Sequence, residues 1–396
     1  MKEVSKIAAG VTASTTLAVD SLYKQMKADG LDVVGFGAGE PDFDTPDNIK
    51  QAAIKAITAG KTKYTSAAGL LSLREAISKR FAADFGVEYK AAEIVVASGA
   101  KHSLFAAVMT LLNPGDEVVV PAPYWVTYTE VVKIAGGVPV AVSAPEDKNF
   151  KISAVELEAE ITPKTKLFIL NNPSNPTGML YSEDELKSLI DVCVKHDLYI
   201  LSDEIYSGLV YDGKKFRSVA SFGEDVRERT IIINGVSKSY AMTGWRIGYS
   251  VSSARLATLM ANYLSHSTSA PSTISQIAAE EALSGPQDAV IAMRDVFEKR
   301  RDYIFERLNS IKGVSCIKPN GAFYIMVNIK EQIGRTISGV KINNGDDFAM
   351  ALLKYGHVAM VSCVGFGNPN FLRMTYAESL DNIKEGLDRL EAFLKS

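Results

Sequence analysis

Short apolar runs alternate, over the first two thirds of the chain, with longer segments in which apolar residues recur every three or four positions. The runs at 94–97, 117–121, 166–170, 198–201 and 231–233 are typical of strands that are buried on both faces of a sheet. The longer segments between them predict helices. We therefore expect an α/β fold, in which helices cover a mostly parallel sheet.

The pattern changes near residue 285, where a Gly-Pro pair interrupts the helical periodicity. A long charged helix is predicted over 287–308. Four strand-like runs and a closing amphipathic helix follow, at 314–317, 323–327, 358–364, 371–376 and 379–394. The sequence thus predicts a large domain over 46–285 and a small α+β domain formed by 1–45 and 286–396.

Composition narrows the function classes. The formal net charge is −3 and no basic run is present, so nucleic acid is not an expected partner. The three cysteines and four histidines are scattered without metal-ligand spacing, and we expect no metal site. No apolar run is long enough to cross a bilayer and the start lacks the apolar core of a signal peptide, which indicates a cytoplasmic protein.

Chemistry-bearing residues follow several of the predicted strands. Lys238 comes five residues after the strand at 231–233, and Asp203 comes two residues after the strand at 198–201. In an open α/β sheet, ligands bind outside the carboxyl ends of the strands. After the strand at 94–97, Ser98-Gly-Ala-Lys101 opens a helix whose free N–H groups form a natural phosphate cradle.

Three alternating glycines after an early strand raise the alternative of a dinucleotide-binding enzyme. Gly35, Gly37 and Gly39 are followed by Glu40-Pro41, and no helix begins there. The run therefore lacks the context of a dinucleotide fingerprint, and a dehydrogenase is disfavoured. Glycine at these positions would instead let backbone amides approach a small anion.

A buried carboxylate at Asp203 requires a cationic partner, because an uncompensated buried charge costs several kcal/mol or more. Arg246 or a protonated pyridine nitrogen would supply that charge. A lysine able to form a Schiff base at Lys238, an aromatic platform at Trp125 and a phosphate cradle complete the set. Together these features describe a site for pyridoxal 5′-phosphate.

Several motifs carry a resemblance to a known family. Asn175-Pro-Thr-Gly178, Ser202-Asp-Glu-Ile-Tyr206 and the stretch from Ser237 through Gly248 resemble the class I, fold-type I pyridoxal-phosphate aminotransferases, and aspartate aminotransferases among them. The likeness extends nearly end to end, with further matching motifs at 39–46, 63–64, 123–125, 321–324 and 373.

The resemblance implies a role for each matching residue at the cofactor. Lys238 would hold the cofactor through a Schiff base, and Asp203 would keep the pyridine nitrogen protonated. Tyr206 and Asn175 would hydrogen-bond the ring hydroxyl oxygen, while Trp125 would stack on the ring. The phosphate would be held by Gly99, Ala100, Ser237 and Arg246, with Tyr64 reaching in from the second subunit of a homodimer.

The family also implies how substrates are held. Arg373 and the backbone at Gly39 would grip the α-carboxylate, with Trp125 and Asn175 beside it. Many relatives bind a distal carboxylate with an arginine from the segment matching 265–271, which contains no arginine here. In the branch that this chain resembles, the residues matching Lys101 and Thr16 take that role.

The implied function is amino-group transfer between aspartate or glutamate and a 2-oxo acid, with ping-pong kinetics. Prephenate as acceptor, aromatic or alanine donors, and lyase chemistry remain alternatives on the same fold. A non-catalytic effector-binding domain is a further alternative, and we expect it less because no DNA-binding segment is visible and the catalytic positions are complete.

Overall fold

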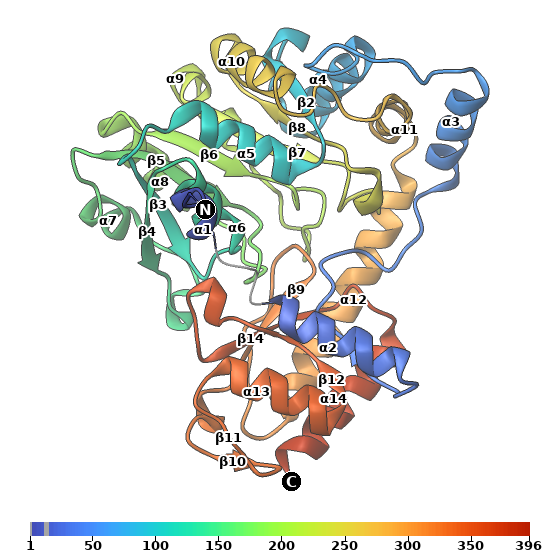
Figure 1. The fold of residues 1–396 in the computed structure, drawn as a ribbon, viewed down its shortest axis with the longest axis vertical. Coiled ribbons are helices and arrows are strands. Elements are labelled where there is room, and N and C mark those ends of the chain that lie inside the picture. The colour runs from blue at the N-terminus through green and yellow to red at the C-terminus, as the bar shows by residue number, and fades with distance from the viewer. Residues whose placement is uncertain (1, 12–15) are drawn as a thin grey trace.

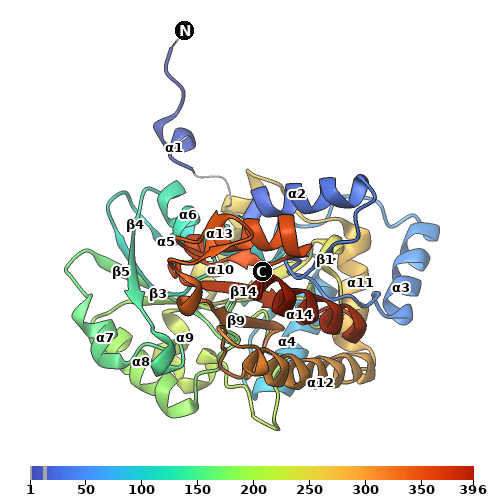
Figure 2. The ribbon, with the colours of Figure 1, turned by 90° about the horizontal axis from the view of Figure 1, so that it is seen from below.

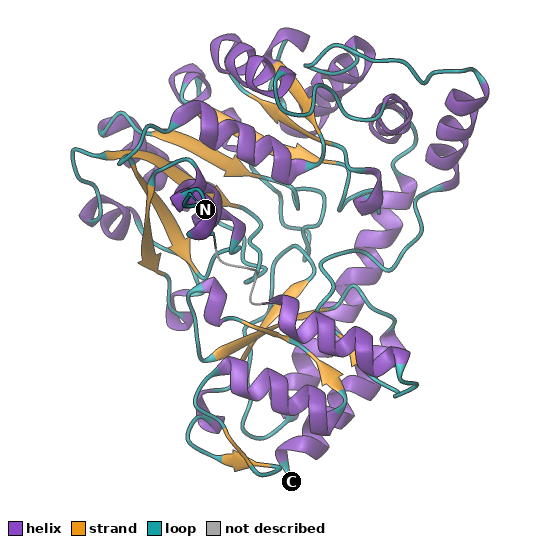
Figure 3. Ribbon diagram, in the orientation of Figure 1, coloured by secondary structure: helices purple, strands orange, loops and turns teal. Residues whose placement is uncertain are grey.

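A seven-stranded sheet forms the centre of the larger part of the molecule in the computed structural model, which describes residues 2–11 and 16–396 (Figures 1 and 3). In spatial order its strands are β2 (Ile94–Ala97), β8 (Gly248–Val251), β7 (Thr230–Gly235), β6 (Tyr199–Asp203), β5 (Thr165–Asn171), β3 (Glu117–Ala122) and β4 (Val138–Ser143). Neighbouring strands are parallel except at β8, which runs antiparallel to both β2 and β7. The predicted α/β fold with a mostly parallel sheet is confirmed.

Strand β7 illustrates why these runs form buried strands. All six of its residues are buried, and alternate side chains enter different cores. Ile231 and Ile233 belong to the core on one face of the sheet, whereas Ile232 belongs to the core on the other face. A strand with apolar side chains at every position is stable only when helices cover both faces.

Two layers of helices provide that cover (Figure 1). The core that includes Ile231 and Ile233 also takes in side chains from α5 (Ala100–Leu111), α6 (Thr127–Ile134) and α10 (Ala254–Ser265). The core on the other face takes in side chains from α3 (Asp47–Thr58), α4 (Leu71–Phe85), α7 (Ala154–Ala159), α8 (Glu183–Lys195), α9 (Glu224–Glu228) and α11 (Thr273–Ser284). Helix α8 begins with a reciprocal capping box between Ser182 and Glu185.

A smaller part of the molecule lies below the large sheet in Figure 1. It contains the antiparallel sheet β13-β14-β9, made of β13 (Val361–Ser362), β14 (Phe371–Thr375) and β9 (Tyr324–Asn328). Two-stranded pairs join β1 (Val34–Gly35) to β12 (Val358–Ala359) and β10 (Thr336–Ile337) to β11 (Val340–Lys341). The helices of this part are α2 (Thr16–Ala28), α12 (Asp288–Ser310), α13 (Gly345–Ala351) and α14 (Leu380–Leu394).

Helix α12 runs from the large sheet into the smaller part (Figure 1). Its Arg301 is fully buried and forms a two-pronged ion pair with Asp212, with both N–O distances at 2.8 Å. The neighbouring Arg300 pairs in the same way with Asp42, at 2.7 and 2.9 Å. Such planar, bidentate pairs fix the orientation of both partners.

The remaining elements are short. Helix α1 (Lys6–Ala9) lies in a segment that extends away from the rest of the chain (Figure 2). Single helical turns occur at η1 (Ala91–Glu93), η2 (Glu146–Lys148), η3 (Val219–Phe222), η4 (Thr243–Trp245), η5 (Lys330–Gln332), η6 (Leu352–Gly356) and η7 (Val364–Phe366). None of the helices in the described ranges combines the length and apolar character that a bilayer crossing requires.

The structure corrects two of the predicted elements. No strand forms over 314–317, where only Ser315 makes an isolated bridge, to Asn328. The run 358–364 is divided between β12 and β13, which belong to different sheets. The proposed domain boundary at 285–286 falls between α11 and α12 and stays a prediction.

Candidate active site

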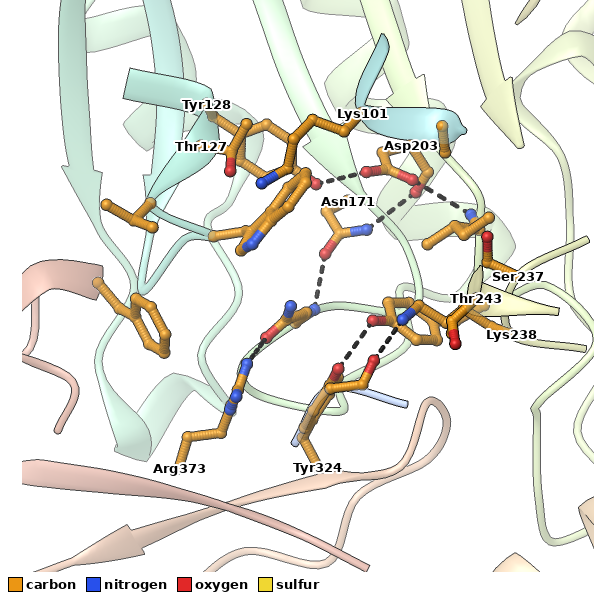
Figure 4. A pocket seen from close by; sticks show the side chains of 18 of the residues that line it. Lys101, Thr127, Tyr128, Asn171, Asp203, Ser237, Lys238, Thr243, Tyr324 and Arg373 are labelled. Atoms are coloured by element: carbon orange, nitrogen blue, oxygen red, sulfur yellow. Dashed lines mark hydrogen bonds between the residues drawn. The ribbon is translucent and has the colours of Figure 1, made fainter. Parts of the chain in front are cut away.

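A cavity of about 490 Å³ opens at the carboxyl ends of β5, β6 and β7 and is closed from below by the smaller part (Figure 4). Residues that the sequence analysis singled out line it: Gly39, Ala100, Lys101, Trp125, Asn175, Asp203, Tyr206, Ser237, Lys238, Arg246 and Arg373. The convergence expected from the strand ends is therefore what the structure shows. A cavity of this size fits a small organic ligand.

Asp203, the last residue of β6, is buried and its carboxylate accepts two hydrogen bonds. The Tyr128 hydroxyl donates to Oδ2 over 2.7 Å, and the backbone N–H of Ile205 donates to Oδ1 over 3.2 Å. Burial raises the pKa of Asp203 to about 6, although Tyr128 and Lys238 both act to lower it. Arg246, which the sequence suggested as its protein partner, instead donates to the backbone carbonyls of Thr243 and Ser98.

Lys238 lies three residues beyond the end of β7, as its charge requires. Its ammonium group donates to the backbone carbonyl of Gly39 and lies 5.7 Å from the centre of the Phe323 ring. Burial and the nearby Arg373 lower the pKa of Lys238 to about 8. The lowered pKa increases the fraction of this side chain that is free amine near neutral pH, and the free amine is a nucleophile and a base.

The start of α5 approaches Arg246 and β8 very closely. Gly99, the residue before the helix, has a φ of 90° and offers no side-chain cap to the first N–H groups. A Cβ atom there would lie 2.2 Å from Nη2 of Arg246, and one on Gly248 would lie 2.1 Å from the backbone nitrogen of Ala100. Free helix N–H groups beside a guanidinium form an anion site.

Arg373 projects from β14 toward the same cavity. Its guanidinium donates to Asn175 Oδ1 over 3.2 Å and to the Gly37 carbonyl over 2.8 Å, and it stacks on the Tyr324 ring at 4.5 Å. Both partners are neutral acceptors, and Nε is buried without a hydrogen bond. The positive charge is therefore held rigidly and has no anionic partner among the described residues, which suits it to binding a carboxylate.

Two tyrosine hydroxyls meet where the two parts of the molecule face each other. Tyr206 and Tyr324 are both buried, and their oxygens lie 3.0 Å apart. Burial raises the pKa of the Tyr206 hydroxyl well above its ordinary value, and the contact with Tyr324 adds to this effect. Tyr206 is therefore neutral at physiological pH and can donate a hydrogen bond into the cavity.

Lys101 lies on the rim formed by α5. Its ammonium group is 4.8 Å from the centre of the Trp125 ring, a cation–π contact. The pKa of Lys101 is lowered, first by partial desolvation of its ammonium group and second by the nearby positive charge of Arg246. Trp125 in turn packs edge-on against Tyr128, with ring centres 5.5 Å apart.

Two predicted residues do not line the cavity, and the side chain of a third is not described. Gly99 lies just behind its wall, in contact range of Arg246. Tyr64 is 99% exposed on this single chain. Thr16 is the first residue of α2, and its side chain lies outside the described part of the chain.

The structure also adds residues that sequence reasoning did not assign. Tyr128 is the direct partner of Asp203, and Tyr324 links Tyr206 to Arg373. Tyr128 follows Trp125 by three residues, a spacing that places both side chains on one face of a helical turn. This spacing is the sequence feature that could have indicated Tyr128. Over residues 2–11 and 16–396, no group of three or more His, Cys, Asp and Glu side chains is arranged to bind a metal ion.

Comparison with known proteins places this site in a family. The family model described as aminotransferase class I and II matches residues 31–390. The aspartate aminotransferase of Geobacillus stearothermophilus is 48% identical over 394 residues, covering 100% of this chain and 99% of the relative. The aspartate/prephenate aminotransferase of Cereibacter sphaeroides is 46% identical over 396 residues, covering 99% of each.

Solved structures agree with the sequence relatives. An aspartate aminotransferase from Rhizobium meliloti superposes with a TM-score of 0.96 at 41% identity, covering 100% of this chain and 99% of the other. The Thermus thermophilus aspartate aminotransferase with maleate gives a TM-score of 0.93 at 37% identity, covering 99% of this chain and 100% of the other. Because the match extends over the whole chain in sequence and in fold, this protein belongs to the class I and II aminotransferases.

Proposed function

We propose that this aminotransferase uses pyridoxal 5′-phosphate to move the amino group of aspartate or glutamate to 2-oxoglutarate or oxaloacetate. The observation that carries the proposal is the joint placement of Lys238, Asp203 and the α5 anion site around one cavity. Family membership supports the reaction class. The names of the relatives support aspartate, and maleate in the Thermus structure supports a dicarboxylic ligand.

The residues present fit this cofactor. A phosphate would be held by the uncapped N–H groups of α5 at Gly99 and Ala100, by Ser237 and by Arg246. The Arg246 guanidinium occupies the space that a Cβ atom on Gly99 would fill. The absence of that side chain lets the guanidinium lie directly beside the backbone at the start of α5. Trp125 would stack on the ring.

Asp203 fits the ring nitrogen of the cofactor. Its carboxylate is buried and has no cation in contact among the described residues, so a protonated ring nitrogen would supply the missing charge. Tyr128 holds the carboxylate in position. Tyr206 and Asn175 would donate hydrogen bonds to the ring hydroxyl oxygen.

Bound pyridoxal phosphate supplies an aldehyde that condenses with amines and a ring that withdraws electrons from the attached carbon. Lys238 performs the proton transfers. Its free amine, favoured by the lowered pKa, would take the proton from the substrate Cα and deliver it to the cofactor carbon that carries the aldehyde. Burial keeps water from competing for that proton.

Arg373 would bind the α-carboxylate of both the amino acid and the oxo acid. Its planar guanidinium is already oriented by Asn175 and Gly37, so binding requires little rearrangement. The Gly39 backbone would assist. Because donor and acceptor use the same arginine and the same lysine in turn, the kinetics should be ping-pong.

The distal carboxylate is proposed to meet Lys101, together with Thr16. The segment 265–271 contains no arginine, so the usual partner-subunit cation is absent. Lys101 lines the cavity, and its neighbours Trp125 and Arg246 carry no negative charge. Its ammonium group can therefore pair with a carboxylate of the substrate. Prephenate, which also carries two carboxylates, remains a second acceptor, because a relative named for aspartate and prephenate is 46% identical.

We predict that pyridoxal phosphate is bound covalently to Lys238. The purified protein should absorb visible light, and borohydride should fix the cofactor on the peptide that contains Lys238. Lys238→Ala should lose this covalent label, whereas Lys187→Ala, on the exposed face of α8, should keep it. Labelling of any other lysine would overturn the assignment of the site.

We predict that Asp203 destabilises the cofactor-free protein above pH 6. Burial raises its folded pKa from 3.8 to about 6, so the folded state binds more protons than the unfolded state in that interval. Stability present below pH 4 is then lost as the pH rises through 6. In urea unfolding, Asp203→Asn should therefore gain up to about 3 kcal/mol at pH 7 and little at pH 4. Equal effects at both pH values would contradict this.

We predict that Lys101→Ala selectively impairs dicarboxylic substrates. Removing one member of a charge pair costs about 2 kcal/mol or more, so kcat/KM for aspartate should fall on the order of 30-fold. Activity with alanine should change little, because alanine has no distal carboxylate. A panel of donors and acceptors, prephenate included, tests this. Equal losses for aspartate and alanine would leave the substrate of the aminotransferase unassigned.

We predict a homodimer in which Tyr64 completes the partner's site. Tyr64 is 99% exposed and outside the cavity of its own chain, although the family places this tyrosine at the cofactor phosphate. Tyr64→Phe and Lys238→Ala variants, unfolded together and refolded, should regain part of the activity in mixed dimers. A fully active monomer in sedimentation analysis would be incompatible with shared sites.

A further inference from the structure

A second cavity, of about 450 Å³, lies behind the segment that carries Lys238. It is bounded by α4, by the loop that follows Tyr206 and by the first turns of α12. Its volume is close to that of the active-site cavity and falls in the range of small-molecule sites. None of the roles proposed above uses it.

The cavity wall carries an excess of positive charge. Arg80, Lys214, Lys215 and Arg294 line it, against a single acid, Asp84. Arg294 pairs with Asp295, but Lys214 and Lys215 are exposed and form no ion pair within the described chain. This imbalance attracts an anion.

Arg80 lines the cavity beside the acid Asp84. Its Nε is shielded from solvent without a hydrogen bond, and its nearest acid oxygen, on Asp84, is 3.6 Å away. That distance is too long for a hydrogen bond. The ion pair with Asp84 is therefore a loose one, and the guanidinium of Arg80 still contributes positive charge to the cavity wall.

The rest of the wall is largely aromatic. Phe85 and Phe216 meet edge-to-face with ring centres 5.4 Å apart, and Phe81 and Tyr240 lie nearby. Tyr249 is buried and its hydroxyl makes no hydrogen bond to any described residue. Aromatic walls favour a flat ring, which they can contact edge-on or face-on.

We propose that this cavity is a second binding site, for a small aromatic carboxylate. The carboxylate would meet Arg80 and the two free lysines, and the ring would lie among the phenylalanine and tyrosine side chains. An aliphatic acid would leave the aromatic wall uncovered, and a neutral aromatic compound would leave the excess positive charge of the wall without an anion. Binding at this site therefore requires both the carboxylate and the aromatic ring of the ligand.

A ligand in this cavity would contact residues next to Lys238 in the sequence and could therefore shift the position of Lys238. Tyr240, two residues after Lys238, donates to Gln287 Oε1 over 2.8 Å at the start of α12. Ser239 packs so closely on Gly208 that a Cβ there would lie 2.7 Å from its hydroxyl oxygen. A bound ligand thus contacts both the segment that carries Lys238 and the helix that enters the smaller part.

The test is calorimetric titration of the cofactor-loaded protein with 3-phenylpropionate, which has no amino or oxo group to react. We expect saturable binding at this cavity that weakens at least tenfold in Arg80→Gln and in the double variant Lys214→Gln/Lys215→Gln. Lys187→Gln is the control, since it removes an exposed lysine of α8 that does not line this cavity. Butanoate and 3-phenyl-1-propanol should each bind at least tenfold more weakly than 3-phenylpropionate.

The active site provides the competing explanation, because Arg373 also binds carboxylates. Binding in the second cavity should persist in Arg373→Gln. Binding that is lost in Arg373→Gln and unchanged in the double lysine variant would overturn the proposal. The double variant replaces only exposed side chains, so that it tests the site even if Arg80→Gln fails to fold. This outcome is independent of whether the enzyme acts on aspartate.

Discussion

Two opposite charges are held at the ends of neighbouring strands without touching, and the rest of the site depends on this separation. Asp203 is engaged by Tyr128 and Lys238 by the Gly39 carbonyl, and no ion pair joins the two among the described residues. If they met directly, each would lose the charge complementarity that it offers to a ligand. Burial instead shifts both toward their neutral forms, to pKa values of about 6 and about 8. The protein keeps a reactive amine and a ligand-ready carboxylate at the expense of its own stability.

The edge of the sheet was predictable because its cause is local. Fully apolar runs mark strands buried on both faces, and polar residues directly after them must lie at the strand ends. Parallel pairing then brings Asp203 and Lys238 to one edge whatever the details of the loops. The capping box between Ser182 and Glu185 is equally local, since its partners lie within three residues of each other.

Other features depend on contacts that no local pattern records. The partner of Asp203 is Tyr128, 75 residues away, and the pairing follows from where α6 crosses the sheet. A charged partner was expected because charge balance can be read from sequence, whereas a neutral hydroxyl cannot be singled out. The run at 314–317 alternates as a strand does, but only Ser315 finds a neighbour, at Asn328. Tyr64 is 99% exposed on this chain, and no local sequence pattern indicates a contact for it.

Helix α12 has a mechanical consequence beyond its packing. Its 23 residues span about 35 Å, with Gln287 at one end hydrogen-bonded to Tyr240, two residues after Lys238. At that length, a tilt of about 10° around Gln287 carries the far end through about 6 Å. The ion pairs of Arg300 with Asp42 and of Arg301 with Asp212 lie midway along the helix. Any tilt that preserves them must move Asp42 and Asp212 together with the helix. The stiffness with which this helix joins Gln287 to its far end in the smaller part is therefore set by two guanidinium groups.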